Sequence, residues 1–190
     1  MSEENAGRYG ETATVEVDPG SVGRIRLAYS PHTDGAADPG EIVWTWVPYE
    51  ERDGRGKDRP VLVVATAPGG ALLGVALTSK PHDDRWDVAI GSGPWDSAGR
   101  PSWVRLERVF RLQQGGIRRA GVGLDEARYG AVAAALAARY GWPAPTSVKQ
   151  TRTPAPTRTP APTRGGRAAS ASRPGGVRAT VMRALRRFFG

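Results

Sequence analysis

The segment PVLVVATAPGGALLGVALT, residues 60–78, constrains the fold of this chain more than any other. Two apolar runs, 60–66 and 71–78, are joined by Ala-Pro-Gly-Gly, a connection typical of a β-hairpin. The first run is uninterrupted and short, which indicates a strand buried on both of its faces. The sequence therefore predicts an antiparallel hairpin at the centre of a sheet.

Further strands are predicted around this hairpin from β-branched, aromatic and alternating residues, at 23–29, 41–49, 86–90 and 102–112. Residues 124–140 are rich in alanine, begin with acidic residues and end before a glycine, which predicts a helix. Short strands closed by one helix are typical of a small β-barrel, so the expected fold class is mainly β with a C-terminal helix.

Composition divides the chain into four parts. Residues 1–37 are rich in small and acidic residues and are expected to form a mostly flexible arm, whose last part pairs with the core. Residues 38–142 are expected to form the barrel domain. Residues 143–176 repeat TRTPAP and predict an extended, disordered linker. Residues 177–190 alternate arginines with an apolar stripe and predict a basic amphipathic helix.

The net charge of +8 belongs to the tail. Residues 143–190 hold ten basic and no acidic residues, whereas residues 1–142 hold 17 basic and 19 acidic residues. The tail is therefore a candidate for binding an anionic membrane or nucleic acid. The alternative is a disordered tail whose periodicity is chance.

The chain has no cysteine and no apolar stretch near the roughly 20 residues that a membrane helix needs. Its first residues are polar and acidic, unlike a secretory signal. These features favour the cytoplasm. No cluster of Cys, His or carboxylate residues shows metal-ligand spacing, so no metal and no cofactor are expected.

Arg59 stands at the start of the first hairpin strand, where Pro60 holds its backbone extended. If Thr66 pairs with Ala71, Arg59 lies opposite Thr78 on the same face. A guanidinium fork and a hydroxyl together suit a phosphodiester. The alternative is that Arg59 pairs with Asp58 or a loop glutamate, and that Thr78 only ends a strand.

The stretches PGEIVWTWVPYEERDGRGKDRPVLVVA, LLGVALTSK and SWVRLERV resemble the PemK/MazF family of toxins from type II toxin–antitoxin modules, over residues 38–142. The actinobacterial members are the most similar. The resemblance implies an SH3-like barrel of the PemK/CcdB type that forms a homodimer. It also implies a metal-independent endoribonuclease (mRNA interferase) that cleaves single-stranded RNA through 2′-hydroxyl attack and is inhibited by a cognate antitoxin. The family's catalytic arginine and threonine fall on Arg59 and Thr78.

The remaining site residues are assigned by chemistry and position. His82 and Glu50 are the candidates for proton transfer, since an arginine is a poor base. Four residues are expected to bind RNA: Lys57, Ser79, Lys80 and Trp46. Asp58 departs from the family pattern, because many members carry a basic residue or histidine there. The alternative function is a non-catalytic SH3-like barrel that binds a protein or nucleic acid.

Overall fold

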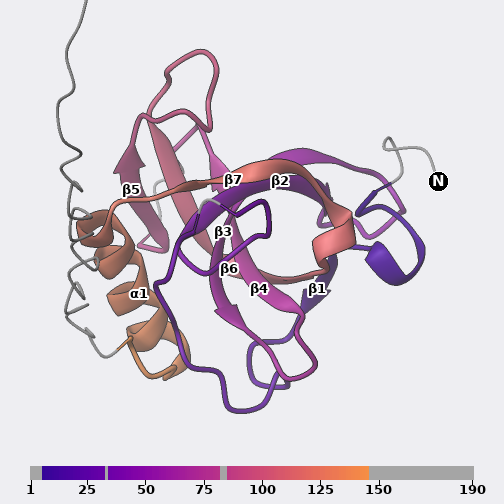
Figure 1. Ribbon diagram of the computed structural model, residues 1–190, viewed down its shortest axis with the longest axis horizontal. Coiled ribbons are helices and arrows are strands. Elements are labelled where there is room, and N and C mark those ends of the chain that lie inside the picture. Colours follow the sequence, from indigo (N-terminus) through magenta and orange to yellow (C-terminus); the bar gives the residue numbers. More distant parts are fainter. Residues whose placement is uncertain (1–5, 33, 82–84, 146–190) are drawn as a thin grey trace, which may run out of the picture. The chain divides into compact units, whose positions relative to one another are not determined.

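The computed structural model describes residues 6–32, 34–81 and 85–145. In this part of the chain, seven strands form one curled antiparallel sheet with the order β1-β6-β4-β3-β2-β7, and β5 pairs with β6 (Figure 1). The strands are β1 (Val15–Val17), β2 (Glu41–Pro48), β3 (Gly56–Thr66), β4 (Leu72–Thr78), β5 (Asp87–Gly91), β6 (Ser102–Leu112) and β7 (Ile117–Gly123). Two short 3-10 helices, η2 (Gly10–Thr12) and η3 (Gln114–Gly116), and the helix α1 (Glu126–Tyr140) complete these elements.

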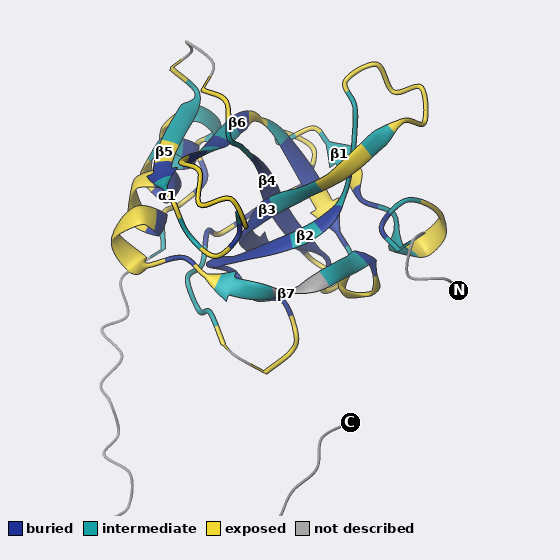
Figure 2. Cartoon of the chain, turned by 90° about the horizontal axis from the view of Figure 1, so that it is seen from above, coloured by how far each residue is buried: buried dark blue, intermediate teal, exposed yellow. Residues whose placement is uncertain are grey.

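The mainly β fold with a closing helix is confirmed. The central hairpin is formed by β3 and β4, and its apolar run faces two separate cores. Leu62 and Val64 belong to a cluster that includes residues of α1, whereas Val61 and Val63 belong to a second cluster with Phe110. Figure 2 shows this burial along the middle of the sheet, with exposed residues in the outer loops. The continuous apolar pattern therefore reflects burial on both faces, as expected.

Helix α1 ends where the sequence predicts and begins at Glu126, two residues after the predicted start. The side chain of Asp125 accepts a hydrogen bond from the backbone N–H of Arg128, which caps the first turn. Gly141 ends the helix with φ 70°, a left-handed conformation that glycine adopts without strain. The inward face consists of Tyr129, Val132, Ala133 and Leu136, at the spacing of an amphipathic helix. In Figure 1 the helix lies on one side of the curled sheet, beside β5.

The described residues before Asp38 pack against the sheet, and they include the last part of the arm, which was expected to pair with the core. Strand β1 pairs with β6, and Val22, Ile25 and Leu27 are buried in the same core as α1. The segment predicted as a strand at 23–29 is irregular, although Ala28 donates a backbone hydrogen bond to Val64. These apolar residues are sparse in a glycine-rich and polar segment, so their burial depends on contacts that local composition does not reveal.

Strand β7 was not predicted. Its sequence, IRRAGVG, has few β-branched residues, yet it pairs with β2 along the sheet edge. The expected linker at 143–176 and amphipathic helix at 177–190 lie outside the described residues, apart from 143–145. Within the described residues, no helix is long and apolar enough to cross a membrane.

Candidate functional site

The hairpin brings Arg59 and Thr78 to one end of the sheet. Thr66 pairs with Leu72 rather than Ala71, so the expected start of the hairpin is wrong by one residue. A bulge between Val63 and Ala65 then shifts the register, and Val61 pairs with Ala76. Continuing that register by two residues makes Arg59 level with Thr78. The predicted juxtaposition therefore arises because the bulge offsets the shifted start.

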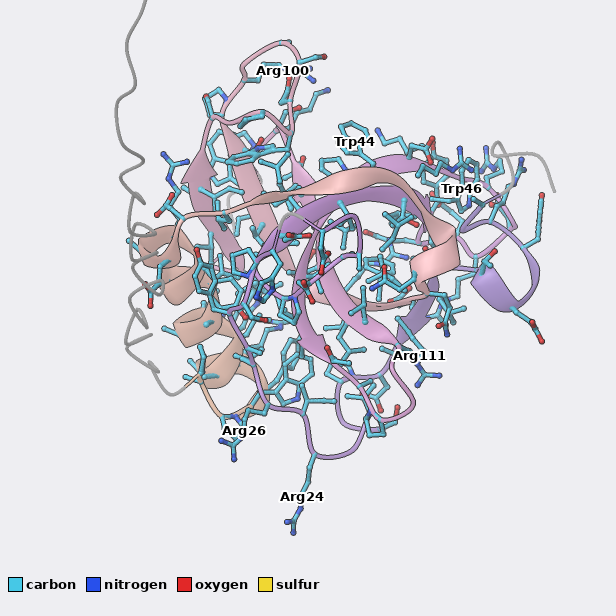
Figure 3. All side chains as sticks on the ribbon, viewed as in Figure 1. Arg24, Arg26, Trp44, Trp46, Arg100 and Arg111 are labelled. Atoms are coloured by element: carbon cyan, nitrogen blue, oxygen red, sulfur yellow. The ribbon has the colours of Figure 1, made fainter. Side chains whose placement is uncertain are left out.

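Arg59 and Thr78 line the same open cavity, whose volume is about 420 Å³. Its walls come from β2, the first half of β3, the end of β4 and the turn after it, the first half of β6, and the loop between β5 and β6, which carries Arg100 at its outer end in Figure 3. Five basic residues line it, namely Lys57, Arg59, Lys80, Arg100 and Arg105, against the two acidic residues Asp58 and Asp96. The cavity is thus locally cationic although residues 1–142 carry a small acidic excess.

Arg59 is half-buried and has no acidic partner in the part of the chain that the structure describes. Among the described residues, no carboxylate lies within ion-pair distance of its guanidinium. Burial has the largest effect on the pKa of Arg59 and lowers it. Tyr49 has the next largest effect and raises this pKa, the charges of Arg105 and Arg108 then lower it, and Glu50 raises it least. A partly desolvated cation without a counter-ion is costly and favours binding of an anion. The arrangement differs from the alternative in which Arg59 forms a salt bridge with Asp58 or a loop glutamate.

Asp58 does not neutralise its neighbour. Its Oδ2 atom accepts a hydrogen bond from Nη1 of Arg118 at 2.9 Å, and the two form an ion pair. The adjacent Lys57 has a lowered pKa, chiefly because of the positive charge of Arg59. The cation Lys80 also contributes to that lowering. Lys57, Arg59 and Lys80 therefore form a group of mutually repelling cations.

Thr78 sits at the end of β4 with its hydroxyl in a tight turn. Its Oγ1 atom accepts a hydrogen bond from the backbone N–H of Lys80 and lies 3.1 Å from the Lys80 carbonyl oxygen, to which it donates. Ser79 lies within the same turn and also lines the cavity. The turn thus contributes two hydroxyls and an ammonium to the cavity that Arg59 also lines.

Two further arginines near Arg59 were missed in the sequence. Between Val75 and Leu77 of β4 the register with β6 shifts, so that Ala76 faces the four residues 105–108. This irregularity brings Arg105 and Arg108 close enough to lower the pKa of Arg59. Both are held by acids, Arg105 by Glu107 and Arg108 by Glu16 at 2.8 Å. The break in polar–apolar alternation at Glu107-Arg108 was the feature of the sequence that could have indicated this irregularity.

The two tryptophans of β2 differ in their relation to the cavity. Trp44 lines it, whereas Trp46, the residue assigned to RNA binding, lies outside its walls. Both are only partly buried, and Figure 3 shows them along the same edge of the molecule as Arg100. Trp46 instead contacts Arg8, whose guanidinium carbon lies 4.5 Å from the ring centroid.

Glu50 lies beside a smaller hollow that Arg59 also lines, together with Arg105 and Arg108. It is exposed, and its charge raises the pKa of Arg59 only as a minor effect. His82 falls outside the described residues. Within the described residues, no group of three or more His, Cys, Asp or Glu side chains could hold a metal ion. The cavity offers hydrogen-bond donors and fixed cations, a combination suited to binding and polarising a phosphate.

The fold and cavity define a small curled β-sheet protein with a cationic site built at one end of its central hairpin. The chain belongs to the family of PemK-like, MazF-like toxins of type II toxin–antitoxin systems, whose model matches residues 38–139. A similar solved structure is the crystal structure of MazE–MazF (Form II) from Deinococcus radiodurans, at 18% sequence identity and a TM-score of 0.44. That match covers 57% of this chain and 98% of the other. No curated protein matches the chain.

Proposed function

We propose that this toxin-family protein is an endoribonuclease that cleaves single-stranded RNA without a metal ion. The observation that carries the proposal is the half-buried guanidinium of Arg59, which has no acidic partner among the described residues and lines a cationic cavity with Thr78. Membership of the toxin family supports the same assignment.

In the proposed reaction, the 2′-oxygen of a ribose attacks the adjacent phosphorus and the bond from phosphorus to the 5′-oxygen breaks. Arg59 donates to two phosphate oxygens, and the Thr78 hydroxyl turns from the Lys80 carbonyl, to which it donates in the free protein, to donate to the same developing negative charge. Lys57 and Lys80 hold the flanking phosphates. A base accepts the 2′-hydroxyl proton and an acid protonates the leaving 5′-oxygen, with Glu50 and His82 as the candidates.

The partners follow from the same assignment. The substrate is a single strand, since 2′-oxygen attack requires the sugar and phosphate to rotate into line and Trp44 at the cavity wall can stack an unpaired base. We propose that the protein acts as a homodimer in the cytoplasm and is inhibited by a cognate antitoxin, as its family membership suggests.

The test is to incubate the purified full-length protein with single-stranded RNA in EDTA and analyse the ends of the products. We expect cleavage, with a 2′,3′-cyclic phosphate on one product and a 5′-hydroxyl on the other. Strict dependence on magnesium, or 5′-phosphate ends, would refute this mechanism. No cleavage of any RNA by the folded protein would favour a non-catalytic binding module.

A further inference from the structure

A segment before the family-matched range lies against β2 and is fixed there by several contacts. Nε of Arg118 donates to the carbonyl of Ala6 at 3.0 Å. The Thr45 hydroxyl donates its proton to the Gly116 carbonyl. The Thr14 hydroxyl lies 2.8 Å from the Thr45 hydroxyl oxygen and is therefore the donor in that hydrogen bond. Gly7 has φ 77°, and a Cβ there would lie 2.6 Å from the Gly116 carbonyl oxygen. Residues 6–14 are therefore built to approach the sheet closely.

This segment places an arginine between two aromatic residues. The guanidinium carbon of Arg8 lies 4.5 Å from the Trp46 ring centroid and 4.8 Å from that of Tyr9. Nε of Arg8 is buried without a hydrogen-bond partner, which indicates that the guanidinium is held by its ring contacts. Tyr9 is 57% exposed, and Val15 at 51% is the other exposed large hydrophobic residue in the described chain.

The aromatic group adjoins the cationic cavity. Trp46 pairs across the sheet with Asp58, which lines the cavity, and Arg118 joins Asp58 to Ala6. Figure 3 shows Trp44 and Trp46 along one edge, with Arg24 and Arg111 pointing away on the other side. A strand of RNA leaving the cavity past Asp58 would thus meet Trp46, Arg8 and Tyr9.

We propose that Tyr9, held by Arg8 against Trp46, is a base-stacking subsite for a nucleotide that flanks the cleaved bond. The inference rests on the proposed RNA substrate and names a part of its binding surface. Tyr9 and Arg8 lie outside the family-matched residues 38–139, so the subsite belongs to this chain's own N-terminal segment.

The chemistry of the subsite favours a nucleotide. An exposed aromatic ring offers a face to any unpaired base, and an adjoining guanidinium attracts the phosphate that accompanies it. Asp58, which pairs across the sheet with Trp46, has its charge offset by the ion pair with Arg118, and the exposed Glu11 is the other acid of this segment. Stacking of one base on one aromatic side chain is worth about 1–3 kcal/mol, at least fivefold in affinity.

The test measures equilibrium binding of the full-length protein to fluorescent 2′-O-methyl oligonucleotides, which lack the 2′-hydroxyl and cannot be cleaved by the proposed route. We compare a mixed sequence of about ten nucleotides with one of about three, which is too short to leave the cavity. Tyr9→Ala should weaken binding of the longer strand about tenfold and of the shorter one less than about twofold. Tyr9→Phe should bind both as the unaltered protein does, because the ring remains.

Matched variants separate stacking from charge and from general loss of exposed apolar surface. Arg8→Lys keeps the charge but loses the planar contact, so it should weaken long-strand binding nearly as much as Arg8→Ala. Arg24→Ala and Val15→Ala should have no effect, since Arg24 points away in Figure 3 and Val15 is the other exposed large hydrophobic residue. Equal binding by Tyr9→Ala and unaltered protein would overturn the proposal, as would equal losses in Tyr9→Ala and Val15→Ala.

Three further outcomes separate the subsite from a protein interface and from the proposed function. If Tyr9→Ala leaves oligonucleotide binding intact but weakens binding of the cognate antitoxin, the surface is a protein interface and the proposal is wrong. If Tyr9→Ala weakens strand binding while the unaltered protein cleaves no RNA, the subsite stands and the proposed catalytic function fails. Cleavage with no effect of Tyr9→Ala overturns only the subsite.

Discussion

At the scale of single residues, the carboxylate next to Arg59 in the sequence, Asp58, is paired with another arginine. Asp58 is paired with Arg118 at 2.9 Å, and Arg59 has no acidic partner among the residues that the structure describes. The departure from the family pattern at position 58 is thereby compensated by an arginine from β7. Sequence alone could not reveal this, because the two residues are distant in the chain.

Arg118→Ala should release Asp58 and lower the activity that depends on Arg59. We expect kcat/KM for RNA cleavage to fall about fivefold, equivalent to about 1 kcal/mol for a partly exposed pair. Adding Asp58→Asn to this variant should restore most of the loss, since the unpaired carboxylate is then gone. A double variant no better than Arg118→Ala would mean that Arg118 acts only through its bond to the Ala6 carbonyl.

Tyr129 is the residue whose ionisation should affect stability at high pH. Its hydroxyl donates to the Val64 carbonyl at 3.0 Å, and burial raises the pKa of Tyr129 well above its usual range. Tyr129→Phe should lower the free energy of unfolding by about 1 kcal/mol at neutral pH, measured by urea denaturation.

The pH dependence has a definite sign. Above about pH 10 the unfolded chain loses the Tyr129 proton while the folded chain keeps it, so the stability of the unaltered protein falls with rising pH. The Tyr129→Phe variant has no proton to lose at this position. The difference in free energy of unfolding between it and the unaltered protein should therefore shrink above about pH 10. If that difference in free energy of unfolding stays constant at pH values above the ordinary tyrosine pKa, the fold does not raise the pKa of Tyr129.

At the scale of elements, the packing of the central hairpin requires a glycine at position 74 of β4, where side chains of β3 and β6 come close. A Cβ at Gly74 would lie 2.5 Å from Cγ1 of Val61 and 2.9 Å from Cδ1 of Leu112. Gly74→Ala should therefore destabilise the protein by about 1–3 kcal/mol through overpacking. It should also reduce RNA cleavage, because Arg59 and Thr78 lie at the end of the same hairpin.

Gly130→Ala is the matched control. Gly130 is exposed within α1, and a Cβ there meets no atom within 4 Å. The substitution should stabilise the protein by about 0.5–1 kcal/mol, since alanine is the better helix former. Thermal unfolding of both variants gives the comparison. Equal effects of the two changes would contradict the close packing at Gly74.

The elements also show what the sequence could and could not predict. The strands β2, β3, β4 and β6 and the helix were predictable because their apolar periodicity and end signals are local. Strand β7 was not, since it packs on β2 with a register shift and with Gly121 so close to Glu41 that a Cβ there would lie 2.1 Å from Oε2. A close approach of this kind is visible only once the sheet is formed.

At the scale of the whole molecule, the cationic site is a local feature. The described part of the chain places five basic residues around one cavity although residues 1–142 are slightly acidic overall. The juxtaposition of Arg59 and Thr78 was predictable from hairpin register, with the bulge near Val63 correcting the one-residue error. Arg105 and Arg108 were not, because an irregularity between β4 and β6 brings them there.

The most direct measurement is RNA cleavage by three full-length variants that each alter one arginine. Arg59→Ala should abolish cleavage, because it removes the guanidinium that binds the phosphate. The far-ultraviolet circular dichroism should stay unchanged, because the substitution removes a half-buried charge and leaves the sheet intact. Arg59→Lys should recover little activity, since an ammonium cannot donate to two phosphate oxygens in one plane. Arg111→Ala removes an exposed arginine on the other side of the molecule and should cleave normally (Figure 3). Undiminished cleavage by Arg59→Ala, or equal losses in Arg59→Ala and Arg111→Ala, would contradict the assignment of Arg59 as the phosphate-binding group.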